Sequence, residues 1–305
     1  MKQSGIIEAP PRVLIFGAGL SGLSAWKNLK QAHQVLGFID NDANKQGKTY
    51  CELPVFAPEQ LNELCFEVIF IASEYIENIK AQLLEDARIP AEKVKTLPSY
   101  MTKPMQFGEQ KGSIEAGEQV LCWLCQMFND VEVQYFLDAG TLLGIVRDGA
   151  LIPWDDDLDI GIPLRELDRV YSLLENHLCE LEQCTGIAWR VDQVLSEHQF
   201  GVIKPGDVRS LKLSPKLGGQ ECELAFPMVD LFVKYPNGNT ADYALASRGI
   251  SMPIEHFQTT DLIQFSGIAM KTPANPELYL ERYYGDWKTP QKEWDVGMIS
   301  SASSF

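Results

Sequence analysis

The feature that most constrains the fold is an apolar run that leads directly into a glycine-rich turn. Val13–Phe16 contains no polar residue and is followed by Gly17, Gly19 and Gly22 in the spacing Gly-x-Gly-x-x-Gly. A strand, a glycine turn and a helix in this order are typical of the nucleotide-binding edge of a parallel sheet. Asp40 ends the next strand pattern, near the spacing expected for a ribose-binding acid. The same glycines also serve simple packing of a helix on a sheet, so nucleotide binding and a structural or oligomerising role both stay open.

The first hundred residues alternate strand and helix patterns. After the glycine turn, these patterns cover Gln34–Ile39, Glu67–Ala72 and Ile76–Leu84. The alternation predicts an α/β fold with a parallel sheet covered on both faces. The pattern breaks between Ser99 and about Gly117, where proline and glycine stand among polar residues, and we place a linker there. We therefore predict a Rossmann-like domain over residues 1–104 and a second, α+β domain over residues 105–305.

The second domain mixes the two kinds of pattern without regular alternation. Helical patterns cover Ile114–Phe128, Leu164–Leu181 and Pro276–Tyr284. Strand patterns cover Val131–Leu137, Asp157–Ile162 and Met228–Val233. Cys122 and Cys125 lie on the first of these helices, where core packing explains them better than zinc does, because a second cysteine pair in register is missing.

The densest chemistry of the sequence lies between Asp138 and Asp159. Gly140 and Thr141 form a turn with backbone room and an amide or hydroxyl for a phosphate. Asp157 and Asp159 stand two residues apart on a predicted strand, so both side chains project from the same face. Two adjacent carboxylates repel each other unless a cation neutralises them, and Mg²⁺ typically takes one or two carboxylates together with substrate phosphates.

Other charged residues extend this constellation. Asp230 interrupts an apolar strand pattern, and its burial is better explained if it faces the same metal. The run Asp155–Asp157, taken alone, is typical of a solvated loop, and only its combination with the turn and with Asp230 favours a metal site. Arg147 either neutralises phosphate or holds the aspartates, or it is a surface residue at a helix end. Four basic residues concentrated in one segment contact the substrate diphosphate or belong to a solvated loop: Lys204, Arg209, Lys212 and Lys216.

Asp138–Asp159 resembles the signature of the LicD/fukutin family, and Leu278–Trp287 resembles the closing motif of that family. The resemblance covers roughly residues 115–290 and implies the nucleotidyltransferase fold. It also implies transfer of phosphocholine or a phospho-alditol from a CDP-linked donor to a hydroxyl of a glycan or lipid-linked glycan, with release of CMP, in capsule or lipopolysaccharide modification. Mg²⁺ or Mn²⁺ then falls on Asp157 and Asp159, whereas Asp230 as a third ligand follows from the broader fold pattern.

The closing motif is rich in aromatic residues: Tyr279, Tyr283, Tyr284 and Trp287. These rings either stack on a cytosine base or form core, and the helical spacing of Tyr279 and Tyr283 favours core. In the first domain, the segment Gly17–Asp40 resembles small Rossmann-like domains attached to sugar-modifying transferases.

Two other functions are compatible with parts of the sequence. One is an NAD(P)-dependent sugar oxidoreductase centred on Gly17–Asp40, but we identify no Tyr-Lys pair for hydride chemistry. The other is a non-catalytic scaffold that binds nucleotides, which predicts loss of a metal ligand, whereas Asp157, Asp159 and Asp230 are all present.

Composition limits the partners and the compartment. The net charge of -16 argues against a nucleic-acid partner, which needs clustered basic residues. The sequence contains no apolar run of roughly eighteen residues, so we expect no spanning helix, and its first residues lead into no signal peptide. Seven cysteines in a chain of this size do not indicate a disulfide framework. We expect a cytoplasmic protein, free or peripheral to the inner face of the membrane, and a homo-oligomer is compatible with this.

Overall fold

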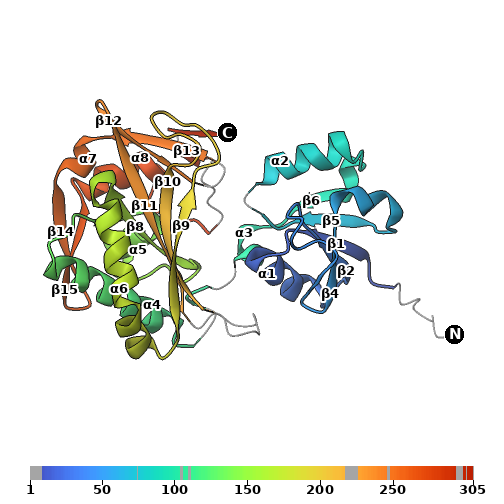
Figure 1. Cartoon of the computed structure of the whole chain (residues 1–305), viewed down its shortest axis with the longest axis horizontal. Coiled ribbons are helices and arrows are strands. Elements are labelled where there is room, and N and C mark those ends of the chain that lie inside the picture. The colour runs from blue at the N-terminus through green and yellow to red at the C-terminus, as the bar shows by residue number, and fades with distance from the viewer. Residues whose placement is uncertain are drawn as a thin grey trace. The chain divides into compact units, whose positions relative to one another are not determined.

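The structure is a computed structural model of the chain, which has 305 residues. It describes residues 9–73, 75–103, 106–108, 111–216, 226–245, 248–292, 298–299 and 301–304. The chain divides into two compact units, Met1–Pro104 and Met105–Phe305 (Figure 1).

The N-terminal unit is built on a six-stranded sheet in the order β3-β4-β2-β1-β5-β6. Its strands are β1 Arg12–Phe16, β2 Gln34–Ile39, β3 Thr49–Tyr50, β4 Leu53–Phe56, β5 Val68–Ile71 and β6 Val94–Thr96. Strand β1 pairs in parallel with β2 and β5, while β3 pairs antiparallel with β4. The sheet is therefore mostly parallel, which confirms the predicted Rossmann-like class.

Helices cover both faces of this sheet. They are α1 Leu20–Leu29, α2 Ile76–Ala81, which continues as a π-helix over Gln82–Asp86, and α3 Ser99–Thr102. Leu14 and Phe16 of β1 belong to one buried apolar cluster, and Val13 and Ile15 belong to another. Because successive side chains of a strand point to opposite faces, the uninterrupted apolar run has core on both sides.

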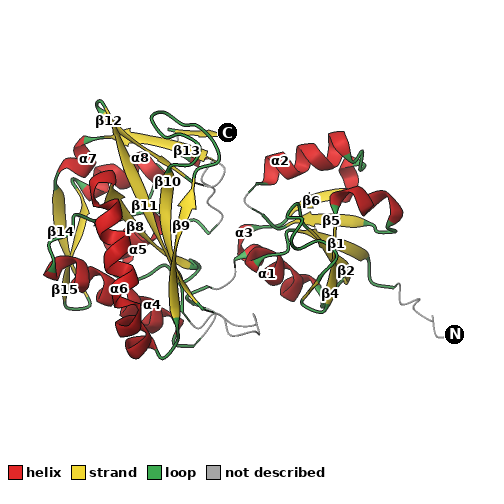
Figure 2. Cartoon of the chain, in the orientation of Figure 1, coloured by secondary structure: helices red, strands yellow, loops and turns green. Residues whose placement is uncertain are grey.

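The C-terminal unit contains a larger, mixed sheet in the order β16-β13-β12-β11-β10-β9, with β8 paired to both β11 and β7 (Figure 2). Its strands are β7 Phe136–Leu137, β8 Asp157–Pro163, β9 Trp189–Leu195, β10 Val208–Pro215, β11 Met228–Asn237, β12 Thr240–Ala244, β13 Arg248–Pro253 and β16 Ala302–Ser304. Strands β14 Thr260–Phe265 and β15 Ile268–Pro273 form a separate hairpin. Strands β8 and β11 run parallel, whereas β10 pairs antiparallel with both of its neighbours.

The helices of this unit are α4 Ser113–Asp130, α5 Ala139–Asp148, α6 Leu167–Thr185, α7 Glu255–Gln258 and α8 Pro276–Tyr284. Helix α5 packs against β8 and α8, so it links the strand that carries Asp157 and Asp159 to the closing motif. It ends at Gly149, whose φ of 67° provides the left-handed turn that commonly terminates a helix. Among the described residues, no helix combines the length and apolar character needed to cross a bilayer.

The structure corrects two predicted features of the second unit. The predicted strand Val131–Leu137 is reduced to Phe136–Leu137, because Glu132 adopts a positive φ of 58° and the amide of Val133 bonds back to Phe128. The predicted linker is also shorter, since α3 and the start of α4 lie within it. Gly117 belongs to α4, where a Cβ atom would lie 2.7 Å from the ring of Phe107, so this glycine serves close packing.

Candidate functional site

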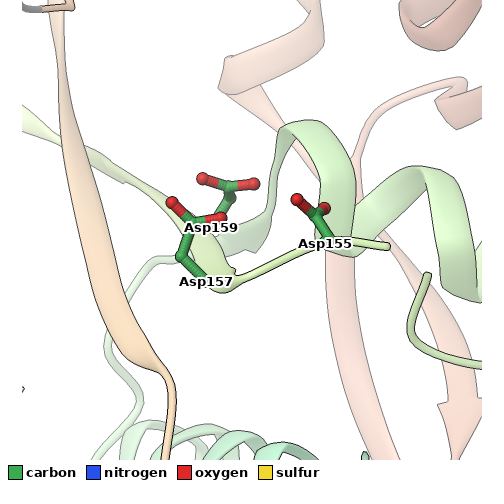
Figure 3. Close-up of side chains that lie close together, drawn as sticks. All are labelled: Asp155, Asp157 and Asp159. Atoms are coloured by element: carbon green, nitrogen blue, oxygen red, sulfur yellow. The ribbon is translucent and has the colours of Figure 1, made fainter. Parts of the chain in front are cut away.

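Three carboxylates gather where β8 begins. Asp155, Asp157 and Asp159 each offer an oxygen atom, and these atoms lie within 4.8 Å of one another (Figure 3). Successive side chains of an extended chain alternate in direction, so these three carboxylates point to one side. Leu158 and Ile160 point to the other side and are fully buried. Hard oxygen donors in this number suit a divalent cation such as Mg²⁺ or Mn²⁺. We refer to these three residues as the acidic cluster.

The turn at the start of α5 fixes the position of Asp159. The amide of Gly140 donates a hydrogen bond to Oδ2 of Asp159 at 3.0 Å, and the amide of Asp159 donates to Oγ1 of Thr141 at 2.8 Å. The backbone of Asp138 donates to the carbonyl of Asp159 at 3.0 Å. The two groups predicted to contact a phosphate therefore bond to Asp159 instead, the Gly140 amide to its carboxylate and the Thr141 hydroxyl to its backbone amide.

A glycine is needed at position 140 for steric reasons. A Cβ atom there would lie 2.1 Å from Oδ2 of Asp155 and 3.4 Å from Oδ2 of Asp159. Ala139, directly before it, has a positive φ of 37°, which is uncommon for a residue with a side chain. The turn therefore brings the backbone of α5 as close to the acidic cluster as the chain permits.

The acidic cluster carries more negative charge than its surroundings balance. Burial raises the pKa of Asp157 well above its usual value, and the charges of Asp159, Asp156 and Asp155 raise it further. Burial likewise raises the pKa of Asp159, followed by the charges of Asp155 and Asp138, against a smaller lowering by the amide of Gly140. A bound cation would remove this repulsion, and the residues present therefore fit a divalent metal.

Asp230 lies beside the acidic cluster on the neighbouring strand. The register of the sheet places Asp192, Lys212, Asp230 and Asp159 in one row across β9, β10, β11 and β8. Nζ of Lys212 lies 3.3 Å from Oδ2 of Asp230. Burial raises the pKa of Asp230, while the charge of Lys212 lowers it in part. The predicted role of Asp230 as a metal ligand stays a prediction. The third carboxylate that comes close to Asp157 and Asp159 is that of Asp155.

Sequence reasoning missed the role of Asp155, because the acidic run resembled a solvated loop. The signal that finds it is the alternation Asp155, Asp157, Asp159, which extends the period of the strand one step before its first residue. The amide of Phe107 donates to the carbonyl of Asp155 at 2.9 Å, which fixes the backbone ahead of the strand.

A buried ion pair behind the turn was also missed. Nζ of Lys234 lies 2.6 Å from Oδ2 of Asp138, and both side chains are 1% exposed. The pair is close without being a well-directed hydrogen bond, and the ammonium group also lies over the ring of Tyr243. Oδ1 of Asp138 accepts hydrogen bonds from the hydroxyl of Tyr279 at 2.6 Å and from the amide of Ala139 at 2.9 Å. This network anchors the first residue of the turn that holds Asp159.

Arg147 lies away from the acidic cluster, in the last turn of α5. Its side chain is 7% exposed and forms a bidentate contact with Asp148, with NH2 at 2.7 Å and Nε at 3.0 Å from Oδ2. Its remaining nitrogen donates to the carbonyl of Trp287 at 3.5 Å. The residue is therefore not a surface arginine, and its described ion pair is with Asp148 and not with the acidic cluster. Its contact with phosphate stays a prediction.

The glycine turn of the N-terminal unit is packed tightly at two of its three glycines. Gly17 has a positive φ of 115°, and a Cβ atom there would lie 2.5 Å from the carbonyl of Ala72. At Gly22 a Cβ atom would lie 1.9 Å from the carbonyl of Gly17. At Gly19 nothing lies within 4 Å. Two glycines are thus explained by packing, and Gly19 is the one at which the backbone is open to approach.

Asp40 supports this turn from the end of β2. Its Oδ2 accepts the amide of Ala18 at 2.8 Å and Nζ of Lys45 at 3.0 Å, and its Oδ1 accepts the amide of Asp42 at 2.9 Å. Partial burial raises the pKa of Asp40, but the two amides and the charge of Lys45 outweigh it and leave the pKa below its usual value. Asp40 therefore has a structural role here, and ribose binding by it stays a prediction.

The mixed sheet, with alternating carboxylates beside a glycine turn, resembles that of a nucleotidyltransferase. Residues 132–275 match the family described as LicD/FKTN/FKRP, nucleotidyltransferase domain, and residues 10–95 match the family described as C2185-like, N-terminal. The chain therefore combines a LicD/FKTN/FKRP nucleotidyltransferase domain with a C2185-like N-terminal domain, which confirms the family resemblance.

Individual proteins match parts of the chain. "Ribitol 5-phosphate transferase FKRP" from Homo sapiens is 27% identical over 156 residues, which make up 50% of this chain and 28% of that protein. The chain thus matches little more than a quarter of the length of this relative. Among solved structures, ANT(2")-Ia in complex with adenylyl-2"-tobramycin has a TM-score of 0.33 and 12% identity, covering 60% of this chain and 84% of that one. UDP-D-quinovosamine 4-dehydrogenase from Vibrio fischeri has a TM-score of 0.25 and 26% identity, covering 29% and 76%.

Proposed function

We propose that the C-terminal unit is a metal-dependent transferase that moves a phosphorylated small group from a CDP-linked donor to a hydroxyl of a glycan or lipid-linked glycan. The observation that carries the proposal is the acidic cluster, three carboxylates within 4.8 Å beside the backbone of α5. The match to the LicD/FKTN/FKRP domain and to a ribitol 5-phosphate transferase supports the class of group that is moved.

The acidic cluster would hold Mg²⁺ or Mn²⁺, with Asp230 as a further ligand from the adjacent strand. A divalent cation held by these carboxylates would neutralise charge on the donor diphosphate and would lower the pKa of the attacking hydroxyl. Asp230 would join the ligands by exchanging its contact with Lys212, whose ammonium group would then face the phosphates. Lys212 lies in the same row of the sheet and its side chain is 35% exposed, so it can make this change without unfolding the strand.

The residues of the turn have a positioning role in this proposal. Gly140 and Thr141 hold Asp159 through one hydrogen bond each, and the buried pair of Asp138 and Lys234 anchors the turn from behind. Phosphoryl transfer depends mainly on positioning and on neutralisation of charge, so a rigid support for the carboxylates is what the reaction requires of the chain.

The proposed reaction breaks the bond between the diphosphate bridging oxygen and the phosphorus of the transferred group. The acceptor oxygen forms the new bond to that phosphorus and releases its proton to solvent, and CMP leaves with the bridging oxygen. A plain nucleotidyltransferase would instead attack the phosphorus next to cytidine and attach CMP to the acceptor. The same carboxylates serve either reaction, and the LicD-type match favours the first.

Product analysis tests this proposal. CDP-choline, CDP-ribitol and CDP-glycerol are incubated with the protein, Mg²⁺ and glycan acceptors, and the nucleotide product is identified by mass. We expect Mg²⁺-dependent release of CMP from one of these donors and a matching gain of mass on the acceptor. A cytidylylated acceptor, or strict use of nucleoside triphosphates, would refute the proposed reaction and leave the metal site standing.

A further inference from the structure

A pocket beside α5 is not explained by the metal site. It is lined by Leu143 and Arg147 of α5, by Tyr284 at the end of α8, and by four residues of the segment that follows α8: Asp286, Trp287, Thr289 and Gln291. All of them belong to the C-terminal unit, which also contains the acidic cluster. The pocket is therefore formed by the helix that supports the cluster, by the closing motif and by the residues directly after that motif.

The pocket lies within reach of the acidic cluster along one face of α5. Gly140, Leu143 and Arg147 follow the spacing i, i+3, i+7, so they share one side of the helix. Gly140 faces Asp155 and Asp159, and a rise of about 1.5 Å per residue places Leu143 and Arg147 roughly 5 and 10 Å further along the axis. A molecule whose phosphates meet the cluster can thus extend into the pocket.

The charge of the pocket does not suit a phosphate. Arg147 is the cation in the lining, and its guanidinium is already neutralised by Asp148 and bonded to the carbonyl of Trp287. Asp286 adds a carboxylate, whose Oδ2 accepts the hydroxyl of Thr289 at 2.8 Å. An anionic ligand group would meet negative charge here without a free positive partner, so the ligand part that fits is uncharged.

The remaining lining suits a flat, polar ring. Tyr284 offers an aromatic ring, and stacking on aromatic side chains is how proteins commonly hold a nucleobase. The exposed amide of Gln291 can both donate and accept hydrogen bonds, as the polar edge of a pyrimidine requires. Tyr279 and Tyr283, by contrast, are 0% and 4% exposed, so they form core. The aromatic residues of the closing motif thus have two roles: Tyr279 and Tyr283 belong to the core, whereas Tyr284 and Trp287 line the pocket.

We propose that this pocket binds the pyrimidine nucleoside of the donor, with the base on Tyr284, while the donor diphosphate extends along α5 to the acidic cluster. The inference rests on the proposed function, because that function supplies a nucleoside diphosphate donor. It assigns a binding role to Tyr284 and Gln291, and it makes Arg147 a positioning residue that holds Trp287 in the pocket wall.

Binding measurements with two probes test the assignment. The affinities for CMP and for inorganic pyrophosphate are measured calorimetrically in Mg²⁺ for the full chain and for Tyr284→Ala, Tyr284→Phe and Gln291→Ala. Gln264→Ala is the matched control, because Gln264 is an exposed glutamine on β14, outside the pocket. We expect Tyr284→Ala to weaken CMP binding roughly tenfold or more through lost stacking. Tyr284→Phe keeps the ring and the affinity, Gln291→Ala weakens CMP binding by a smaller factor, and pyrophosphate binding is unchanged throughout.

The outcomes separate this inference from the proposed function. If the wild-type chain releases CMP from a CDP-linked donor but Tyr284→Ala and Gln291→Ala bind CMP as tightly as wild type, the pocket assignment is wrong and the function stands. If no CDP-linked donor is turned over but CMP binding still depends on Tyr284, the function fails and the pocket assignment stands. Absence of CMP binding by the wild type overturns the assignment. Gln291 is exposed, so its variant keeps the test informative even if Tyr284→Ala unfolds.

Discussion

Two turns in this molecule are built alike. In the N-terminal unit, the amide of Ala18 donates to Oδ2 of Asp40 at 2.8 Å, and in the C-terminal unit, the amide of Gly140 donates to Oδ2 of Asp159 at 3.0 Å. In both, the amide belongs to a glycine-containing turn at the start of a helix, and the carboxylate belongs to a neighbouring strand or its end.

The two turns differ in how their charge is balanced. Asp40 has the amides and Lys45 around it, and its pKa lies below the usual value. Asp159 has burial and further carboxylates around it, and its pKa lies well above the usual value. A carboxylate whose charge the protein balances is part of the architecture, whereas a cluster left with excess negative charge is prepared for a cation. The comparison explains why the turn at Asp40 needs no cation to balance its charge, whereas the turn at Asp159 implies a metal.

The largest expected effect follows from removing a carboxylate of the acidic cluster. Asp157→Asn or Asp159→Asn should reduce CMP release at least about 10²-fold, because a ligand of the cation is weakened. The melting temperature in EDTA should not fall, since one of several repelling charges is gone. Wild-type turnover in either variant would remove the metal site from the account.

The second effect concerns the balanced pair inside the C-terminal unit. Lys234→Met should lower the free energy of unfolding by about 3–5 kcal/mol, because it leaves the carboxylate of Asp138 buried without its partner. The double variant with Asp138→Asn should recover part of this loss, which a denaturant titration of all three proteins would measure. Equal stability of Lys234→Met and wild type would show that the pair does not support the turn.

The third effect asks whether the acidic cluster depends on the first unit. We propose that a fragment starting at Met105 folds and binds metal by itself, whereas one starting at Gln110 loses about 3 kcal/mol or more of stability. The shorter fragment lacks Phe107, which packs on Gly117 and whose amide bonds to Asp155. Thermal melting and metal titration of both fragments check this, and equal behaviour of the two would contradict it.

The smallest effect is at the balanced turn of the first unit. Asp40→Asn should cost about 1–2 kcal/mol at neutral pH, because hydrogen bonds to a charged group are lost. The pKa of Asp40 is lowered, so this stabilisation is fully present above the ordinary pKa of an aspartate and is lost as the pH falls through the lowered folded-state pKa.

The free energy of unfolding should depend on pH in the opposite direction at the acidic cluster. The pKa of Asp157 is raised, so without metal wild type loses stability relative to Asp157→Asn as the pH rises from the ordinary pKa of an aspartate to the raised folded-state pKa. Denaturant titrations of wild type and both variants over a pH series would measure the two trends. Trends of the same sign would contradict the comparison.

Local patterns were enough to predict much of the fold. The apolar run before Gly17 gave a buried strand, and Pro276–Tyr284 forms a helix with the predicted bounds, since proline is favoured in a first turn. The period of two placed Asp157 and Asp159 on one face. These features depend on neighbours in the chain, and a sequence displays such neighbours directly.

What the sequence did not provide depends on pairing between distant segments. Lys234 meets Asp138 only because β8 pairs with both β11 and β7, and β7 leads into α5. Lys212 meets Asp230 only through the register of β10 on β11. The predicted strand Val131–Leu137 is shortened because Glu132 adopts a positive φ. Glycine is the residue that usually adopts such a φ, so a glutamate gives no signal of it in the sequence. Register and long-range packing therefore limit the prediction of this site more than residue chemistry does.

The central claim is that the acidic cluster holds excess negative charge that a cation relieves. Calorimetric titration of the full chain with Mn²⁺, in buffers of different ionisation enthalpy and at several pH values between about 5 and 8, measures binding and the protons released together. The account predicts saturable binding by wild type and weaker binding by Asp157→Asn, and any proton release should grow as the pH falls, because the metal displaces protons from carboxylates whose pKa is raised. It predicts no change in Asp40→Asn. Absence of binding, or binding by Asp157→Asn as tight as by wild type, would contradict it.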